Sequence, residues 1–266
     1  MYLDFWKMSL LPFENVPSPR FFYPSYMHEE ALQRMIYTID QGKGAAMIVG
    51  DVGCGKTLIG NTLARKLADK KYHVVSMTNP SLSALAFLQM VSALFGVPEQ
   101  TSSSKPRLWR GIEKKLRHNN HGNRSVLIID EAQCISDKRT LEELRMLLNL
   151  QADDRFLINV ILLGQNEMET MIRRMNPLNQ RIAIKYRLLA LSPEDTANYI
   201  RHRLNVAGCH EVPFGDEAII RIFEYSGGIP RVINNLCDRS LLAAFLQKTK
   251  DISEPIVEQA WADFDY

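Results

Sequence analysis

The stretch Ala45 to Thr57, AAMIVGDVGCGKT, decides the fold and predicts a phosphate-binding loop. Residues 45–49 are small or apolar and predict a buried parallel strand. Residues 50–57 match G-x-x-x-x-G-K-[ST] at every fixed position, and residues 58–70 have the apolar periodicity of a helix. Glycines let backbone N–H groups curl around a phosphate, and a helix N-terminus adds partial positive charge. The order strand, glycine loop, helix therefore argues against a chance match in a glycine turn.

Two side chains of this loop are predicted to carry its chemistry. Lys56 is expected to reach the β- and γ-phosphate oxygens of a nucleotide, and Thr57 is expected to bind Mg²⁺. The other loop residues predicted to contact the nucleotide are Gly50, Asp51, Val52, Gly53, Cys54, Gly55 and Leu58.

A second motif, Val126 to Glu131 (VLIIDE), predicts a buried strand that ends in two carboxylates. Ligands bind at the carboxyl ends of strands in open parallel sheets. We expect Asp130 to hold the Mg²⁺ shell, directly or through water, and Glu131 to act as general base on the attacking water. The spacing from Lys56 to Asp130 leaves room for an intervening strand, as in the additional-strand branch of P-loop ATPases. A strand ending in solvated acids is the alternative.

Two further polar residues are placed by predicted strands. Gln165 follows a predicted buried strand over 156–163 and is the candidate to sense the γ-phosphate or the attacking water; an ordinary strand-to-loop polar residue is the alternative. Arg181 precedes the predicted last strand, 182–188, and is the candidate arginine finger for a neighbouring subunit, where such a residue contributes about 10³–10⁵ in rate. Its rivals are Arg187 and Arg174, and a surface arginine paired with an acid is the alternative.

The composition changes at Leu191, and everything after it reads as helical. Ser192-Pro193-Glu194-Asp195 is a strong helix start, with a cap, a proline and acids in the first turn. Arg231 is predicted in the first turn of a later helix, where it opposes the helix dipole, so we expect it to meet an anion such as the γ-phosphate. The predicted organisation is an N-terminal arm (1–26), an α/β nucleotide-binding domain (27–190) and an all-α lid (191–266).

Two other segments leave alternatives open. The arm is rich in aromatic residues and prolines and is expected to be irregular, either near an adenine ring or simply packed on the surface. After a predicted polar loop (101–104), the stretch from Lys105 to Arg124 is the one concentrated basic stretch. Its basic residues could meet double-stranded DNA, acidic lipid or an acidic partner, but a solvated helix face is the favoured interpretation.

Composition restricts the class of protein. The chain has 266 residues, 46% hydrophobic residues and a net charge of +2, which is too small to demand a nucleic-acid or anionic-lipid partner. No apolar run reaches the roughly 18 residues of a membrane span, and no secretory signal is evident, so we expect an intracellular protein without direct membrane insertion. The four cysteines are widely spaced, which argues against a zinc site.

Together these motifs resemble the AAA+ ATPases of the general secretion pathway protein A family. The segments that carry the resemblance, besides the phosphate loop, are Leu11-Pro12-Phe13, Pro19-Arg20-Phe21-Phe22-Tyr23, His28-Glu29-Glu30-Ala31-Leu32, Leu127-Ile128-Ile129-Asp130-Glu131-Ala132-Gln133, Leu163-Gly164-Gln165, Gln180-Arg181-Ile182, Tyr199-Ile200-Arg201-His202-Arg203-Leu204 and Ser226-Gly227-Gly228-Ile229-Pro230-Arg231. The resemblance implies a five-stranded parallel sheet flanked by helices, a helical lid, ATP with Mg²⁺ as cofactors, and self-association into a ring or filament.

The resemblance also implies a role at the cell envelope. Type II secretion members help to assemble an outer-membrane secretin and continue into a transmembrane helix and a peptidoglycan-binding domain. Because this sequence stops at Tyr266, we expect a short form that is cytoplasmic, or peripheral at the inner membrane through a secretion or pilus assembly partner. Two alternatives remain: a DNA-binding AAA+ regulator of transposition target choice, and a nucleotide switch that does not hydrolyse ATP.

Overall fold

The computed structural model describes residues 2–68, 72–98, 104–120, 124–152 and 155–263. The chain divides into two compact units, which are described separately. The sheet unit consists of Glu29–Asp51 and Ile59–Leu188, and the arm–lid unit consists of Met1–His28, Val52–Leu58 and Leu189–Tyr266. The predicted polar loop at 101–104 lies outside the described residues except for Ser104.

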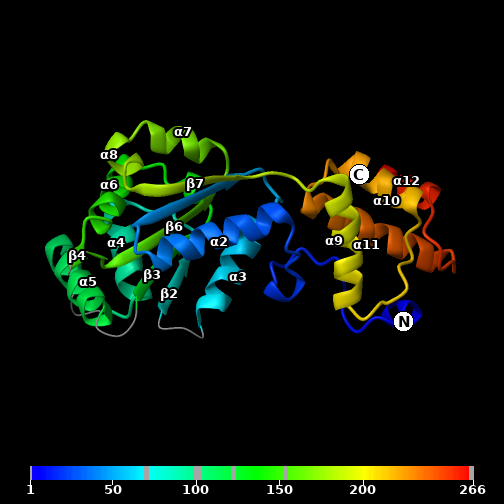
Figure 1. Ribbon diagram of the computed structural model, residues 1–266, viewed down its shortest axis with the longest axis horizontal. Helices are drawn as coiled ribbons and strands as arrows, with labels where there is room; N and C mark the ends of the chain where they lie inside the picture. Colours follow the sequence, from blue (N-terminus) through cyan, green and yellow to red (C-terminus); the bar gives the residue numbers. More distant parts are fainter. Residues whose placement is uncertain (1, 69–71, 99–103, 121–123, 153–154, 264–266) are drawn as a thin grey trace. The chain divides into compact units, whose positions relative to one another are not determined.

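The sheet unit is built on five parallel strands in the order β2-β3-β6-β1-β7 (Figure 1). The strands are β1 (Ala45–Gly50), β2 (Tyr72–Met77), β3 (Arg124–Ile129), β6 (Ile158–Gly164) and β7 (Ile182–Leu188). Strands β1 and β6 are buried along their whole length, as expected for parallel strands covered on both faces. Strand β2 occurs between Lys56 and Asp130 in the sequence, so the intervening strand predicted from their spacing is confirmed. In the sheet, β6 lies between β1 and β3.

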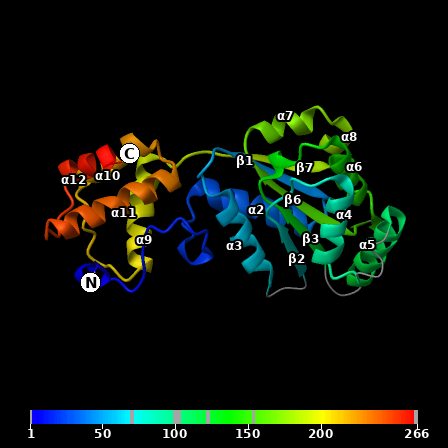
Figure 2. The same ribbon diagram turned by 180° about the vertical axis from the view of Figure 1, so that it is seen from behind.

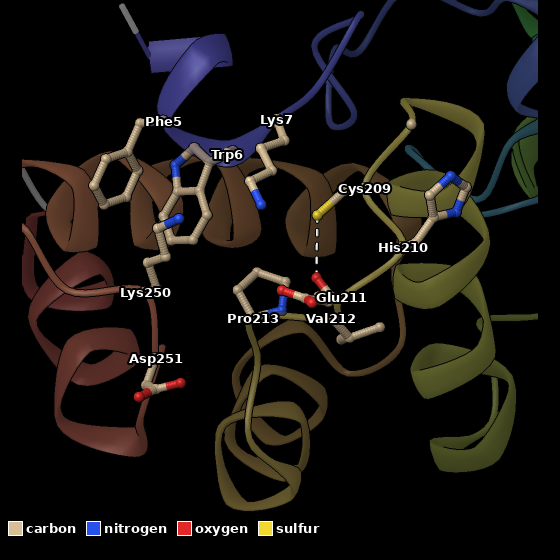
Figure 3. Close-up of a pocket in the computed structure, with 11 residues that line it drawn as sticks. Phe5, Trp6, Lys7, Cys209, His210, Glu211, Val212, Pro213, Lys250 and Asp251 are labelled. Carbon is tan, nitrogen blue, oxygen red and sulfur yellow. Dashed lines mark hydrogen bonds between the residues drawn. The ribbon is translucent and has the colours of Figure 1, made fainter.

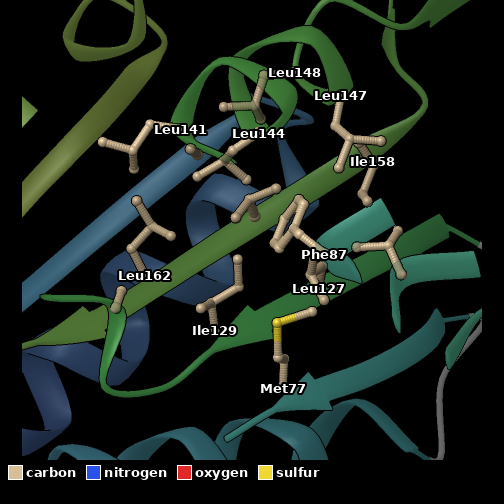
Figure 4. Close-up of a cluster of buried hydrophobic side chains, with 14 of the residues drawn as sticks. Met77, Phe87, Leu127, Ile129, Leu141, Leu144, Leu147, Leu148, Ile158 and Leu162 are labelled. Carbon is tan, nitrogen blue, oxygen red and sulfur yellow. The ribbon is translucent and has the colours of Figure 1, made fainter. Parts of the chain in front are cut away.

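Helices cover both faces of this sheet (Figures 1 and 2). They are α2 (Tyr26–Asp40), α3 (Lys56–Ala68), α4 (Ala84–Leu94), α5 (Lys105–Asn120), α6 (Lys138–Leu147), α7 (Glu167–Arg173) and α8 (Asn176–Asn179). On one face, side chains of β2, β3 and β6 pack with Phe87 of α4 and the leucines of α6 in a single apolar cluster (Figure 4). On the other face, α3 approaches so closely that a Cβ on Gly60 would lie 2.7 Å from Leu163 Cδ1.

One strand begins later than predicted. The expected strand over 156–163 starts at Ile158, because Arg155–Phe156 (β5) pairs instead with Gln151–Ala152 (β4) in a short antiparallel hairpin. A run of apolar residues does not reveal the bend at residue 157, so the sequence pattern merged two strands into one.

The arm–lid unit is helical and contains no named β-strand among its described residues. Its elements are α1 (Tyr2–Trp6), the 3-10 turn η1 (Pro19–Phe21), α9 (Pro193–Val206), α10 (Asp216–Ser226), α11 (Pro230–Leu246) and α12 (Glu254–Ala262). The arm, which was expected to be irregular, opens with helix α1, and residues 7–18 contain no helix or strand. Trp6, Met8 and Phe13 of the arm are buried in the same apolar core as the four lid helices.

One buried arginine ties the arm to α9. Arg203 is 4% exposed, and its guanidinium donates to Pro12 O at 2.5 Å, to Glu14 O at 2.9 Å and to the Tyr199 hydroxyl at 2.7 Å. The same guanidinium lies 4.7 Å from the centre of the Phe21 ring. Since a buried charge must have its donors satisfied, these contacts fix the arm on the lid helices.

None of the helices in the described ranges combines the length and the apolar character that crossing a membrane requires.

Candidate active site

The phosphate loop joins β1 to α3. Gly50 ends the strand, residues 51–55 form the turn, and α3 begins at Lys56, so Lys56, Thr57 and Leu58 occupy its first turn. Gly53 and Gly55 have φ values of +86° and +94°, which residues with a side chain rarely adopt. A glycine turn that leads into a helix N-terminus is the backbone arrangement that binds phosphate in loops of this motif.

Within the arm–lid unit, two groups outside the loop hold consecutive loop carbonyls. The backbone N–H of Arg231 donates to Gly53 O at 3.3 Å, and His28 Nε2 lies 2.9 Å from Cys54 O. Both approaches use the space of a missing side chain. A Cβ on Gly53 would lie 2.8 Å from Arg231 Cβ, and a Cβ on Gly55 would lie 3.1 Å from His28 Nε2. Arg231 is therefore at the loop, in the first turn of α11 as predicted.

Within the sheet unit, the predicted carboxylates and Gln165 form a second group, the carboxylate corner, at the carboxyl ends of β3 and β6. Asp130 is 8% exposed; its backbone N–H donates to Met77 O and its Oδ1 accepts the N–H of Glu131, both at 2.9 Å. Glu131 has a left-handed backbone, with φ 51° and ψ 38°. Such a conformation in a non-glycine residue costs of order 1–3 kcal/mol and is typical of functional sites.

Gln133 bridges the two strand ends of this corner. Its Nε2 donates to Glu131 Oε2, and its Oε1 accepts the backbone N–H of Gln165 at 3.0 Å. Gln165 Nε2 approaches the same Glu131 oxygen at 3.4 Å. Gly164 leaves room for the bridge, because a Cβ there would lie 2.8 Å from Gln133 Oε1. One oxygen of the predicted general base is thus oriented by two amides.

Asn166, the residue after Gln165, reaches the start of the phosphate loop. Its Nδ2 donates to Asp51 Oδ1 at 2.7 Å, so the end of β6 is tied to the end of β1 within the sheet unit. Its Oδ1 is buried and has no hydrogen-bond partner among the described residues. A buried, unpaired amide oxygen next to a candidate site is suited to a ligand or water.

The candidate arginine fingers differ in their surroundings. Exposed Arg187 is held by Glu169 of its own chain at 2.6 Å. Exposed Arg174 lines a hollow of about 670 Å³ between the 3-10 turn η3 (Ala132–Cys134), α6 and α7. Arg181 precedes β7 at the amino edge of the sheet, and β7 spans roughly 20 Å to the carboxyl edge. Arg181 therefore lies far from the carboxylate corner of its own chain.

The basic stretch is partly used for packing inside the sheet unit. Lys105 pairs with the buried Glu143, which also accepts from Trp109 Nε1 at 2.9 Å. Arg124 Nη1 donates to the carbonyls of Ile39 and Asp40 at the end of α2. Arg117 pairs with Glu113 one helical turn away. Other basic residues of the stretch are exposed on α5, namely Arg107, Arg110 and Lys114.

A separate hollow of about 380 Å³ lies in the arm–lid unit, between α1 and the turns that follow α9 and α11 (Figure 3). Its lining includes Trp6, Lys7 and Lys250, and Cys209 Sγ donates to Glu211 O within the turn that follows α9. None of the predicted site residues lines this hollow.

His28, Gln133 and Asn166 were not predicted as site residues. His28 and Gln133 stand in quoted motifs, and Ser25-x-x-His28 at the start of α2 has the spacing of a helix cap with its third residue. That spacing indicates a cap, but no sequence pattern indicates that the capped histidine reaches Cys54.

Comparison with known proteins identifies the class. Residues 39–172, about half of the chain, match the family described as "AAA domain". Among solved structures, the chain is similar to Drosophila ORC bound to DNA (TM-score 0.73, 16% identity, covering 100% of this chain and 66% of that chain). It is also similar to Aeropyrum pernix ORC2 in ADPNP-ADP complexes (TM-score 0.68, 16% identity, 92% and 70%). The chain belongs to the AAA domain family and has the AAA+ P-loop fold predicted from its motifs.

A curated relative is more similar in sequence. The chain is 38% identical over 255 residues to General secretion pathway protein A of Aeromonas hydrophila, a match that includes 95% of this chain. The predicted resemblance to that protein is therefore confirmed. The chain spans about half (46%) of the length of this relative.

Proposed function

We propose that this protein is a Mg²⁺-dependent ATPase that works as an oligomer. The observation that carries the proposal is the placement of three motifs at one edge of the sheet. Gly50 ends β1 and Asp51 follows it, Asp130 and Glu131 follow β3, and Gln165 follows β6. Ligands of open parallel sheets bind at this edge, and the ADPNP-ADP complexes of the similar Aeropyrum protein support a nucleotide as the ligand.

Each residue has a proposed role. The loop amides and Lys56 bind the phosphates, Glu131 accepts a proton from the attacking water, and Gln165 orients that water or the γ-phosphate. Arg231, at the start of α11 beside Gly53, contacts the γ-phosphate as the second sensor. The contact of Asn166 with Asp51 links the end of β6 to the first turn of the loop.

The donor atoms fit Mg²⁺. The Thr57 hydroxyl and the Asp130 carboxylate are hard oxygen ligands, and Mg²⁺ is commonly bound by one or two such groups together with waters and substrate phosphates. In the described part of the chain, no cluster of three or more His, Cys, Asp or Glu side chains offers a metal cage of protein ligands. When bound, Mg²⁺ would neutralise charge on the phosphates.

Oligomerisation is part of the proposal because of Arg181. Its position at the amino edge of the sheet suits an arginine that serves the nucleotide of a neighbouring protomer in a ring or filament. Arg187 is less suited, because Glu169 of its own chain holds it. Residues 191–266 would then act as the lid, with the arm, residues 1–26, packed on it.

The cellular role rests on the relative. Similarity to a protein named General secretion pathway protein A supports assembly or remodelling of a membrane-associated secretion or pilus complex. The protein would act in the cytoplasm, peripheral at the inner membrane through a partner.

A second candidate function is DNA binding. Similarity to an ORC structure bound to DNA favours it, as do the exposed arginines and lysine of α5. The pairing of Lys105, Arg117 and Arg124 within the chain weighs against it.

The test is the ATPase rate against protein concentration, with and without long double-stranded DNA, at two salt concentrations. A rate per protomer that rises with concentration and ignores DNA supports the assembly ATPase. A large stimulation by DNA that disappears at high salt, as phosphate contacts require, supports the second candidate. No hydrolysis at any concentration contradicts the ATPase proposal.

A further inference from the structure

The phosphate loop is held by a histidine that its own motif does not contain. His28 lies in the first turn of α2, is 5% exposed, and reaches Cys54 O through Nε2 at 2.9 Å. Its other ring nitrogen, Nδ1, lies 2.7 Å from the Ser25 hydroxyl. Both ring nitrogens are therefore engaged, one with the loop and one with the residue that precedes α2.

The chemistry of the partners fixes the proton positions. A carbonyl oxygen only accepts, so Nε2 must carry the hydrogen that is donated to Cys54 O. In the neutral ring, Nδ1 then accepts the hydrogen of the Ser25 hydroxyl, and the Ser25 oxygen accepts the His28 backbone N–H at 3.4 Å. Burial lowers the pKa of His28, which favours this neutral form at physiological pH.

The geometry of the peptide bond carries the contact to the opposite side of the loop. In a trans peptide, the C=O and the N–H point in opposite directions, and all peptide bonds described here are trans. Holding Cys54 O toward His28 therefore aims the N–H of Gly55 away from it. Likewise, holding Gly53 O toward Arg231 aims the N–H of Cys54 away from α11. These N–H groups belong to the loop that binds phosphate in this motif.

We propose that His28 is a positioning residue for the phosphate loop: by holding the Cys54 carbonyl, it presets the Gly55 N–H for the nucleotide phosphates. This inference rests on the proposed nucleotide binding. It gives a residue of α2, outside the loop motif, a part in forming the site. The contact between His28 and Cys54 O also requires glycine at position 55, because a side chain there would meet His28.

Two amide substitutions separate this role from a structural one. The Nε2 atom of a glutamine can take the place of the histidine Nε2, so His28→Gln keeps the donor to Cys54 O and loses the acceptor for Ser25. The shorter asparagine matches Nδ1, so His28→Asn keeps a partner for Ser25 and loses the loop contact. The matched control is His210→Asn, on an exposed histidine of the same unit.

The experiment measures the Kd of fluorescently labelled ADP and the thermal midpoint without nucleotide, for the full chain and each variant. One lost hydrogen bond corresponds to about a tenfold change in affinity. We expect His28→Asn to bind ADP about tenfold more weakly, and His28→Gln and His210→Asn to stay within about threefold of the parent. The thermal midpoints of the two His28 variants should be similar.

Three results would overturn the proposal. Equal loss of affinity in both His28 variants would make the histidine a packing residue, and the reverse order would make the Ser25 contact the important one. Parent-like affinity in both would show that the loop needs no such support. If the parent chain itself fails to bind ADP, the proposed function fails, and this is visible before any variant is compared.

Discussion

The phosphate loop and the carboxylate corner differ in which groups must be oriented: backbone donors in the loop and a side-chain acceptor in the corner. The loop must present backbone N–H groups, and it is held through its carbonyls by the backbone of Arg231 and the side chain of His28. The corner must present a carboxylate, and side-chain amides of Gln133 and Gln165 converge on one oxygen of Glu131. The loop is therefore supported by residues distant in sequence, and Glu131 mainly by a residue two positions away. Substitutions that disturb the loop should therefore weaken nucleotide binding, and substitutions in the carboxylate corner should slow hydrolysis while binding is retained.

The largest effect is expected from the loop. Lys56→Ala removes the cation for the phosphates, so we expect nucleotide binding, and with it hydrolysis, to be lost. Equilibrium binding of labelled ATP measures this. Retained affinity in Lys56→Ala would contradict the assignment of the loop as the phosphate site.

A loss of similar size in hydrolysis, without a loss of binding, is expected from Arg181→Ala. An arginine finger contributes about 10³–10⁵ in rate, so this variant should fold and bind ATP but hydrolyse it very slowly. Lys185→Ala, on the neighbouring exposed part of β7, is the control.

Mixing two inactive variants tests whether Arg181 acts on the nucleotide of a neighbouring protomer or on that of its own protomer. Arg181→Ala and Lys56→Ala proteins, each inactive alone, should recover part of the ATPase rate together, because a mixed interface joins an intact loop to an intact arginine. Absence of any recovery would count against Arg181 acting on a neighbour.

The smallest effect is expected within the corner. Gln133→Ala removes one donor to Glu131, so we expect kcat to fall about tenfold with KM unchanged, the size of one hydrogen bond. The control is Lys138→Ala, because Lys138 lines the same hollow of about 670 Å³ as Gln133 and Arg174. A rise in kcat would instead mean that Gln133 holds Glu131 away from its working position.

The sequence patterns predicted the sheet better than they predicted the support of the site. Lys56, Asp130 and the strand over 182–188 could be placed because motif and hydrophobic pattern are local. Gln133 and His28 could not be assigned roles, because their partners are set by backbone turns at Glu131 and Cys54 that no periodicity encodes. The location of the arm was left open for a similar reason: the buried contacts of Arg203 decide where it packs.

The most direct test of the account compares phosphate release and ATP affinity in the parent and in Glu131→Gln. We predict measurable ATP hydrolysis by the parent and unchanged affinity in the variant. Turnover in the variant should be lower by about 10²–10⁴, the usual contribution of a general base. Hydrolysis by Glu131→Gln at the parent rate would contradict the central claim that this corner performs the chemistry.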